Sequence, residues 1–268
     1  MKKMLAALLA LLMIAALVAC SDADEDKDDL DQYKQDEVIV TYETIGNDTF
    51  HFRSIDTESV AITAYEGSDV AHKLSIPTTL NGKTVVAIDE AAFYYSSKIN
   101  ALEIPNTITT IGDYAFAGCA LLTALEIPAN VETIGDGAFY ACTGLLDVKF
   151  AADGKLASIG ENAFNGCEGL TKLSIPASVK TISDGAFMNC YAVAEIVLAE
   201  GVETVGAVAF SNCKALEALT LPETLTNIGA YAFSGTEVLY VDGVTVPADS
   251  VAAKYVADVM KLKEAPIA

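Results

Sequence analysis

The chain has 268 residues, of which 52% are hydrophobic and none is Trp, and its formal net charge is -21 at pH 7. Nucleic acid and anionic lipid surfaces are therefore poor partners, because binding to either depends on clustered Lys and Arg. An apolar N-terminal segment and many Ala residues raise the hydrophobic share, so the remainder agrees with an exported protein that faces water.

The first 19 residues have the pattern of a bacterial signal peptide. Lys2 and Lys3 precede an uninterrupted apolar run over residues 4–19, which is too short to span a bilayer comfortably and is followed by charged residues. The segment Leu17-Val18-Ala19-Cys20 resembles the lipobox of bacterial lipoproteins. That resemblance implies that Cys20 is lipidated and becomes the first mature residue, with membrane contact through the lipid anchor only. The alternative is an ordinary secretion signal in which Cys20 is incidental.

Residues 20–37 form an acidic segment without the apolar residues that a core needs. It contains nine Asp and Glu against two Lys, so we expect a flexible tether. An acidic run directly after the lipidated Cys also resembles the export tag of surface-exposed lipoproteins in some Gram-negative bacteria, although a solvated spacer explains the same residues. A calcium loop of the EF-hand type is disfavoured, because Lys27 and Tyr33 stand where that loop has Gly and Glu.

Residues 38–70 alternate between apolar and polar side chains in the manner of β-strands. Strands are predicted over residues 38–42, 50–53 and 60–65, with turn signals at 46–48 and 56–58 between them. We interpret this segment as an N-terminal β cap that covers the exposed core of the structure that follows.

A repeat dominates residues 71–238. Seven Ala-Phe pairs place Phe at positions 93, 116, 139, 164, 187, 210 and 233, in steps of 23, 23, 25, 23, 23 and 23. The copies over 122–142 and 170–190 define the consensus L-x-x-L-x-I-P-x-x-V-x-x-I-G-x-x-A-F-x-x-C. A period in this range is typical of stacked repeats, so the fold class predicted is a mainly β solenoid of about seven 23-residue coils.

Each consensus position has a physical role, shown here for the copy over 122–142. Leu125 and Ile127 fit a short strand with inward side chains, and Pro128 ends the ladder because it has no amide hydrogen. Phe139 fills the bulk of the coil. One copy cannot bury these side chains alone, whereas copies stacked at about 4.8 Å build a continuous core.

Five cysteines stand at one repeat position, and we expect them to point into the core. They are Cys119, Cys142, Cys167, Cys190 and Cys213. Disulfides are disfavoured because parallel neighbours keep their Cβ atoms about 4.8 Å apart, beyond the roughly 3.8 Å that a disulfide prefers. A linear column of thiols also cannot surround one zinc ion tetrahedrally.

The recurring I-P, I-G, A-F and C positions resemble the BspA-like, Treponema-type leucine-rich repeats of bacterial surface proteins. Segments 81–84 and 246–251 resemble the flanks of that family. Ala151 and Ala199 replace the consensus Pro, and two extra residues lie around 153–154. The resemblance implies a leucine-rich repeat array whose work is binding at the cell surface, in particular adhesion.

Residues 239–268 are expected to form a short C-terminal cap of one strand and one helix. Residues 244–246 should add a last strand, and Asp249 or Ser250 can cap a helix that carries Val251 and Tyr255. The tripeptide over 249–251 also resembles a bacterial O-glycosylation site; helix capping is the preferred interpretation.

A search for catalytic chemistry finds no enzyme signature. His51 and His72 are predicted to be surface residues, and no nucleophile, metalloprotease or phosphate-loop motif occurs. Glu103 and Glu126 could lie one strand apart, but such neighbours are commoner on a solvated sheet than as a catalytic pair. We therefore expect no enzyme activity, no cofactor and no metal site.

The remaining candidate is the outward surface of the predicted strands, which is polar and mixed in charge. The residues expected on this binding face are Lys73, Ser75, Glu103, Glu126, Asp147, Lys149, Lys172, Ser174, Glu195, Thr220 and Tyr240. Outer turns carry more aromatic residues, but Tyr114 and Tyr231, which share a repeat position, lie five coils apart and form no contiguous patch.

Three functions fit this surface. The first is a monomeric, lipid-anchored cell-surface protein that binds a host or bacterial surface protein, in adhesion to host or neighbouring cells. The second is a glycan-binding lipoprotein in nutrient capture, which exposed aromatic side chains would favour. The third is a structural component of the envelope with no soluble ligand.

Overall fold

The computed structural model describes residues 41–236, 244–245, 250, 251, 253–255 and 257. The predicted signal peptide, Cys20 and the acidic tether lie outside the described residues, as does Tyr240. Within the described part of the chain, no helix has the length and apolar character needed to cross a membrane.

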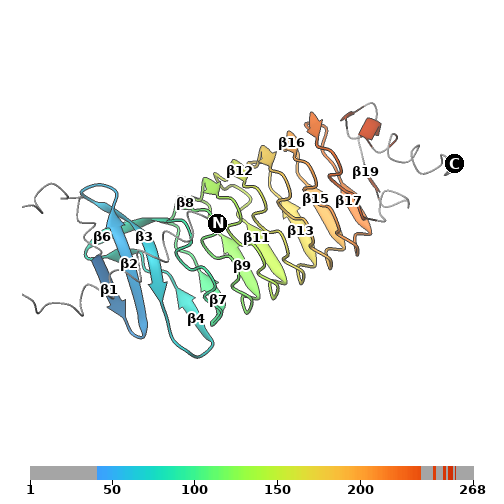
Figure 1. Ribbon diagram of the computed structural model, residues 1–268. Coiled ribbons are helices and arrows are strands. Elements are labelled where there is room, and N and C mark those ends of the chain that lie inside the picture. The colour runs from blue at the N-terminus through green and yellow to red at the C-terminus, as the bar shows by residue number, and fades with distance from the viewer. Residues whose placement is uncertain (1–40, 237–243, 246–249, 252, 256, 258–268) are drawn as a thin grey trace, which may run out of the picture. The chain divides into compact units, whose positions relative to one another are not determined.

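Three antiparallel strands precede the repeats (Figure 1). They are β1 (Thr41–Ile45), β2 (Asp48–Ser54) and β3 (Ser59–Glu66), so the second and third lie where the sequence predicts them, and the first is described from residue 41 onward. Alternation along β2 buries Phe50 and Phe52, which join the hydrophobic core of the repeats. Strand β3 then pairs in parallel with β6 (Lys83–Ile88), so this segment continues directly into the repeat array.

The first coil contains a hairpin that the repeat pattern does not predict. Strand β5 (Thr79–Leu80) pairs antiparallel with β6 through a two-residue turn at Asn81 and Gly82. Both turn residues have left-handed backbone, with φ of 49° and 74°. Asn-Gly is the dipeptide that favours such a turn, because both residues tolerate positive φ.

Each coil contributes one long and one short strand, and the strands form two rows along the solenoid (Figure 1). The long row consists of β4 (His72–Ser75), β7 (Ile99–Glu103), β9 (Ala124–Ile127), β11 (Asp147–Phe150), β13 (Lys172–Ile175), β15 (Glu195–Leu198), β17 (Ala218–Thr220) and β19 (Val244–Thr245). The short row consists of β6, β8 (Thr110–Ile111), β10 (Thr133–Ile134), β12 (Ser158–Ile159), β14 (Thr181–Ile182), β16 (Thr204–Val205) and β18 (Asn227–Ile228). We call the outward surface of the long row the strand face and that of the short row the short-strand face.

Consecutive coils pair in parallel along the whole short row, whereas in the long row the ladders join β4 to β7, β9 to β11, and β13 to β15, β17 and β19 in turn. Leu125 is level with Val148, and Ile134 is level with Ile159, so each apolar position meets its counterpart in the next coil. The apolar consensus positions form one continuous buried cluster from Phe50 to Phe233, with Ile104, Phe150 and Ile228 partly buried against it. The solenoid of about seven coils predicted from the sequence is therefore confirmed.

The seven Phe rings form a stacked column through the core. Centroids of successive rings lie 4.8, 5.3, 5.1, 5.1, 5.5 and 5.2 Å apart, and the planes of Phe116 and Phe139 differ by only 4°. A tyrosine contacts each end: Tyr65 lies 4.9 Å from Phe93, and Tyr255 lies 6.1 Å from Phe233. The column therefore ends against an aromatic ring on both sides.

Left-handed backbone brackets every Phe of the column. The residues two positions before Phe have φ between 49° and 63°, and those two positions after it have φ between 54° and 77°. The first set is Ala91, Tyr114, Gly137, Asn162, Gly185, Val208 and Tyr231; the second is Tyr95, Gly118, Ala141, Gly166, Asn189, Asn212 and Gly235. Gly and Asn hold eight of these fourteen positions, because they tolerate positive φ best.

The five repeat cysteines are free and buried, as the repeat predicts. Each thiol donates to the carbonyl oxygen of the Phe in the preceding coil, over 3.2 Å for Cys142 to Phe116 and 3.6 Å for Cys213 to Phe187. Burial raises the pKa of every one of these thiols, to about 12 for Cys119 and Cys213. They are therefore protonated core side chains.

The described residues near the C-terminus agree with a strand followed by a helical turn. Strand β19 pairs in parallel with β17. Residues 251, 253–255 and 257 have helical backbone, and the Ser250 Oγ accepts a hydrogen bond of 3.0 Å from the Ala253 amide. Ser250 thus acts as the N-cap that the sequence predicts, because its side chain satisfies an otherwise unpaired amide.

Candidate functional site

The strand face displays the side chains that the sequence assigns to a binding surface. Lys73, Ser75, Glu103, Glu126, Asp147, Lys149, Lys172 and Ser174 are exposed, and Glu195 and Thr220 are half-buried. Strand alternation explains this, because the intervening Leu, Val and Ile side chains point into the core. Ten of the eleven predicted positions are described, and all ten lie on this face.

Charged side chains are paired at both ends of the strand face. Lys73 forms an ion pair with Glu103, which also accepts a hydrogen bond of 2.6 Å from the Ser75 hydroxyl. These hydrogen bonds, from Lys73 first and Ser75 second, lower the pKa of Glu103. Near the other end, the Lys172 Nζ lies 3.2 Å from the Glu195 carboxylate. Such exposed pairs contribute little to stability, so they leave the face polar without fixing it rigidly.

Glu103 and Glu126, which lie on neighbouring strands, have different partners. Glu103 is held by Lys73 and Ser75 of the preceding strand, whereas Glu126 is level with Lys149 of the following strand. A glycosidase pair requires one carboxylic acid with a raised pKa, and the pKa of Glu103 is lowered. Glu103 and Glu126 therefore belong to separate polar contacts on the strand face.

A column of carboxylates runs beside the Ala-Phe turns, and none of its residues was among the site residues predicted from the sequence. It occupies the position three residues before Phe in the first five coils: Glu90, Asp113, Asp136, Glu161 and Asp184. We call this set the acidic column. The Asp113 Oδ1 accepts from the Asp136 amide at 2.9 Å, and the Asp136 Oδ1 accepts from the Glu161 amide at 2.7 Å. Asp113, Asp136 and Asp184 thus each link their coil to the next, and the signal that could have revealed them was the recurrence of Asp before left-handed residues.

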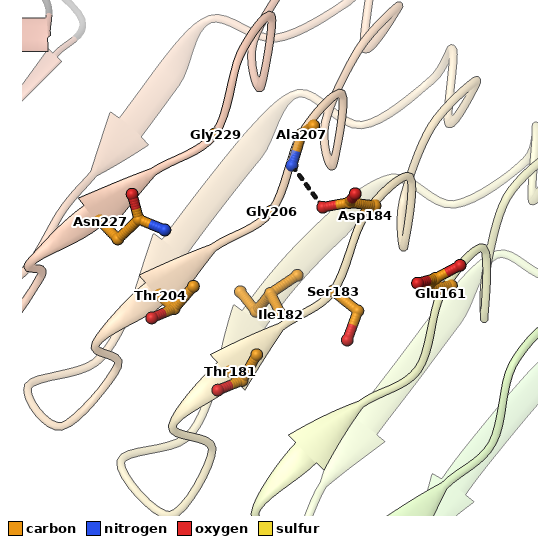
Figure 2. A pocket seen from close by; sticks show the side chains of 10 residues that line it. All are labelled: Glu161, Thr181, Ile182, Ser183, Asp184, Thr204, Gly206, Ala207, Asn227 and Gly229. Atoms are coloured by element: carbon orange, nitrogen blue, oxygen red, sulfur yellow. Dashed lines mark hydrogen bonds between the residues drawn. The ribbon is translucent and has the colours of Figure 1, made fainter.

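A shallow groove of about 360 Å³ opens on the short-strand face where the acidic column ends (Figure 2). Its lining is Glu161, Thr181, Ile182, Ser183, Asp184, Thr204, Gly206, Ala207, Asn227 and Gly229. The sixth coil carries Ala207 where earlier coils have a carboxylate, and the Ala207 amide donates to the Asp184 Oδ1 at 2.7 Å. The groove therefore results from small residues in the last coils, and none of its residues was predicted as a site.

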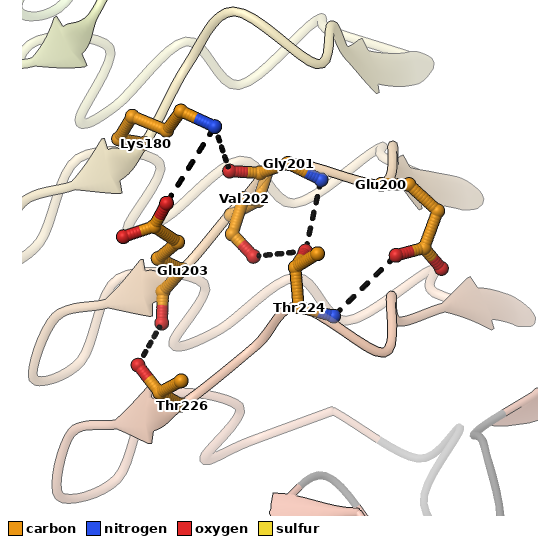
Figure 3. Close-up of polar contacts among 7 residues, drawn as sticks. All are labelled: Lys180, Glu200, Gly201, Val202, Glu203, Thr224 and Thr226. Carbon is orange, nitrogen blue, oxygen red and sulfur yellow. Dashed lines mark hydrogen bonds and ion pairs between the residues drawn. The ribbon is translucent and has the colours of Figure 1, made fainter.

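The loops between long and short strands are joined by hydroxyl groups (Figure 3). The Thr224 Oγ1 accepts from the Gly201 amide and donates to the Val202 carbonyl oxygen, both at 2.8 Å. Lys180 donates to the Gly201 carbonyl oxygen at 3.0 Å and lies 3.5 Å from the Glu203 carboxylate. These contacts hold neighbouring loops together, so this edge of the solenoid has a structural role.

The two histidines are partly exposed, with 21% of the His51 and 20% of the His72 side chain accessible, and both are hydrogen-bonded. The His72 Nε2 lies 2.9 Å from the Tyr65 hydroxyl, which in turn donates to the Asp48 Oδ1 at 2.6 Å. The His51 Nε2 lies 3.2 Å from the Glu66 Oε1. The first network holds Tyr65 against Phe93, where the ring column begins. Tyr65 and its acceptor Asp48 both belong to the folded segment before the repeats.

Metal binding finds no support in the described part of the chain. No group of three or more His, Cys, Asp or Glu there could hold a metal ion. The repeat cysteines, which are the obvious soft ligands, are protonated and each donates to a carbonyl oxygen instead.

Comparisons with solved structures place the solenoid among bacterial leucine-rich repeat proteins. The chain is 29% identical to the Treponema pallidum leucine-rich repeat protein TpLRR, with a TM-score of 0.67, over 77% of this chain and 92% of that one. It is also 29% identical to a leucine-rich repeat protein from Bacteroides ovatus, with a TM-score of 0.65, over 76% of this chain and 53% of that one. A leucine-rich cell surface protein from Faecalibacterium prausnitzii is 28% identical, with a TM-score of 0.62, over 76% of this chain and 54% of that one. The chain thus spans about half the length of the latter two proteins.

A family model gives the same result from the sequence. No match was found among curated proteins. The model described as the BspA type leucine-rich repeat region matches in six copies, over residues 58–193 and 150–247. Because these matches cover more than half of the chain, this protein belongs to the BspA-type leucine-rich repeat family.

Proposed function

We propose that this protein is a bacterial cell-surface lipoprotein that binds another protein through its strand face, in adhesion to host or neighbouring cells. Membership of the BspA-type family supports a binding role and a surface location. The similar F. prausnitzii protein is described as a cell surface protein, which agrees with this location. In this proposal Cys20 carries the lipid and residues 20–37 tether the solenoid to it.

The observation that carries the proposal is the contrast between the two sides of the long strands. Inward positions repeat the same apolar side chains and are buried, so they are committed to folding. Outward positions differ from coil to coil and are largely exposed. Along the long strands, specificity for a partner therefore has to come from the outward set, because the inward positions are alike from coil to coil.

The size of the array agrees with a protein partner. Eight parallel strands in one row present a platform much wider than a sugar ring, and a typical protein interface takes about 800 Å² from each side. The platform is polar and carries both signs of charge at Lys73 and Glu103 and at Lys172 and Glu195. Mixed charge on such a platform is suited to selection of a protein partner rather than to nonspecific attraction.

Two experiments test this function. Protease added to intact cells that produce the protein should remove the solenoid, whereas protection of the solenoid until the cells are opened would rule out adhesion. The purified mature chain should then retain host-matrix or bacterial surface proteins in a binding panel and give no signal on a glycan array. A signal on the glycan array alone would favour nutrient capture, and silence in both together with protection from protease would indicate a structural envelope component.

A further inference from the structure

Four exposed tyrosines gather on the Ala-Phe turns of the first three coils. Tyr94, Tyr95, Tyr114 and Tyr140 are 39%, 62%, 37% and 42% exposed, and we call them the tyrosine patch. The rings of Tyr94 and Tyr95 meet edge to face with centroids 4.6 Å apart. Several large aromatic rings exposed together on a protein surface usually mark an interaction site.

The patch is contiguous because two rings lean onto the following coil. From its left-handed backbone, Tyr114 lies against Gly137, where a Cβ atom would come within 2.4 Å of the ring. Tyr95 lies in the same way against Gly118, at 3.0 Å. The Tyr140 backbone is hydrogen-bonded to both glycines. Its amide donates to the Gly137 carbonyl oxygen at 2.9 Å, and its carbonyl oxygen accepts from the Gly118 amide at 2.8 Å.

Electrostatics agrees with this arrangement. The pKa of Tyr94 is raised, first by burial and then by the neighbouring phenols of Tyr95, Tyr114 and Tyr140. The four residues thus lie on three consecutive turns, although Tyr114 and Tyr140 come from different repeat positions. A comparison of equal positions along the sequence could not detect this, because it sets Tyr114 beside Tyr231, five coils away.

The surroundings of the patch are acidic. The acidic column runs beside it: Asp113 directly precedes Tyr114, and Asp136 directly precedes Gly137, on which the Tyr114 ring lies. The turns that carry the patch, residues 89–95, 112–118 and 135–142, contain no Lys or Arg. Aromatic faces beside carboxylates attract cations, because the ring quadrupole and the negative charge act in the same direction.

We propose that the tyrosine patch and the adjacent carboxylates of Asp113 and Asp136 bind a Lys- and Arg-rich segment of a protein partner. Guanidinium groups stack on tyrosine faces and also pair with carboxylates, so one arginine side chain can use both parts of the surface. A neutral sugar would gain from the rings but not from the charge, and an acidic ligand would be repelled. This is a second binding surface, separate from the strand face.

The test uses the mature chain and a fluorescent Gly-Arg repeat decapeptide, with binding followed by fluorescence anisotropy at physiological salt. The double variant Tyr95→Ala with Tyr140→Ala should bind the peptide about fivefold to tenfold more weakly, as expected for the loss of two exposed cation–π contacts. The matched control is Tyr231→Ala in the last coil, which is 71% exposed and should bind as the parent does. Thermal melts confirm that each variant is folded.

The role of charge is tested with substitutions that keep the hydrogen bonds between coils. Asp113→Asn with Asp136→Asn retains an oxygen acceptor for the next amide and removes two charges, so binding of the decapeptide should weaken. Glu161→Gln with Asp184→Asn removes two charges from the same acidic column farther along and should have a smaller effect. Equal losses in the two double variants would overturn the proposal, because the peptide would then respond to net charge alone.

Two further outcomes overturn the proposal. One is unchanged peptide binding in the Tyr95 and Tyr140 double variant. The other is binding of cellohexaose that this variant abolishes while the decapeptide does not bind, which would make the patch a glycan site. The strand-face variant Lys172→Ala with Glu195→Ala should bind the decapeptide normally, so failure of this proposal can be told apart from failure of strand-face binding.

Discussion

Equivalent loop residues differ between coils in whether their hydroxyl groups are hydrogen-bonded. Thr107 and Thr224 stand at the same repeat position, two residues after Pro105 and Pro222. The Thr224 hydroxyl makes two hydrogen bonds of 2.8 Å, whereas the buried Thr107 hydroxyl has no partner. A buried hydroxyl without a partner destabilises the fold, because it has lost its water and gained nothing in return.

Replacement of these two residues by Val should therefore act in opposite directions. We expect Thr107→Val to raise the free energy of unfolding by about 1 kcal/mol, since it removes an unpaired polar atom. Thr224→Val should lower it by about 1 to 2 kcal/mol, because the Gly201 amide and the Val202 carbonyl oxygen lose a partner. Urea unfolding followed by circular dichroism measures both, and changes of the same sign would contradict the hydrogen-bond assignment.

Val208 is the one β-branched residue among the left-handed positions, with φ of 49°. Gly137 and Gly185 hold the same repeat position without that steric strain. Val208→Gly should therefore stabilise the protein by about 0.5 to 1 kcal/mol, the relief of strain less the entropy cost of glycine. Val202→Gly, at a fully buried position that is not left-handed, is the control and should destabilise it. A lower melting temperature for Val208→Gly would count against the strain.

At the scale of the coil, the stacked Phe column is the main structural element. Phe139 lies between Phe116 and Phe164, with centroid distances of 5.3 and 5.1 Å, and is fully buried. Phe139→Ala should lower the free energy of unfolding by about 3 to 5 kcal/mol, because it leaves a cavity in the middle of the column. Phe139→Leu fills most of that space and should cost less. A melt of Phe139→Ala with unchanged stability would exclude the stacked core.

The cysteine column gives a chemical test of the same element. Burial raises the pKa of Cys119 from about 9 in the unfolded chain to about 12 in the folded protein. The folded state therefore favours the neutral thiol, and its contribution to the free energy of unfolding is complete below pH 9 and is lost as the pH rises towards 12. In mature protein with Cys20→Ser, we expect no thiol to react with Ellman's reagent at pH 8 in the native state and all five to react in urea. Fewer than five in urea without reductant would reveal a disulfide.

Most of this element could be predicted from the sequence, because identical neighbours impose identical environments. The spacing of Phe139 and Cys142 identified inward positions, and the I-P pair marked the end of each long strand. The tyrosine patch could not be found in the same way. Its contiguity depends on Tyr114 leaving its own coil to lie on Gly137, a direction set by left-handed backbone and not by the repeat letters.

At the scale of the whole molecule, the coils combine an invariant interior with a variable exterior. The interior repeats because each buried side chain packs against the equivalent residue of the preceding coil. The exterior is free of that constraint, and both candidate binding surfaces, the strand face and the tyrosine patch, consist of residues that differ between coils. The acidic column shows the limit of this division, since Asp136 is exposed and yet bonds the next coil.

Site-specific photo-crosslinking on producing cells tests most directly whether a protein partner binds on the strand face. A benzophenone amino acid at Ala124 would lie on the strand face, and at Thr133 of the same coil it would lie on the short-strand face; both positions are exposed. We expect a discrete crosslinked protein from Ala124 and none from Thr133. Equal crosslinking from both positions, or a product from Thr133 alone, would contradict it.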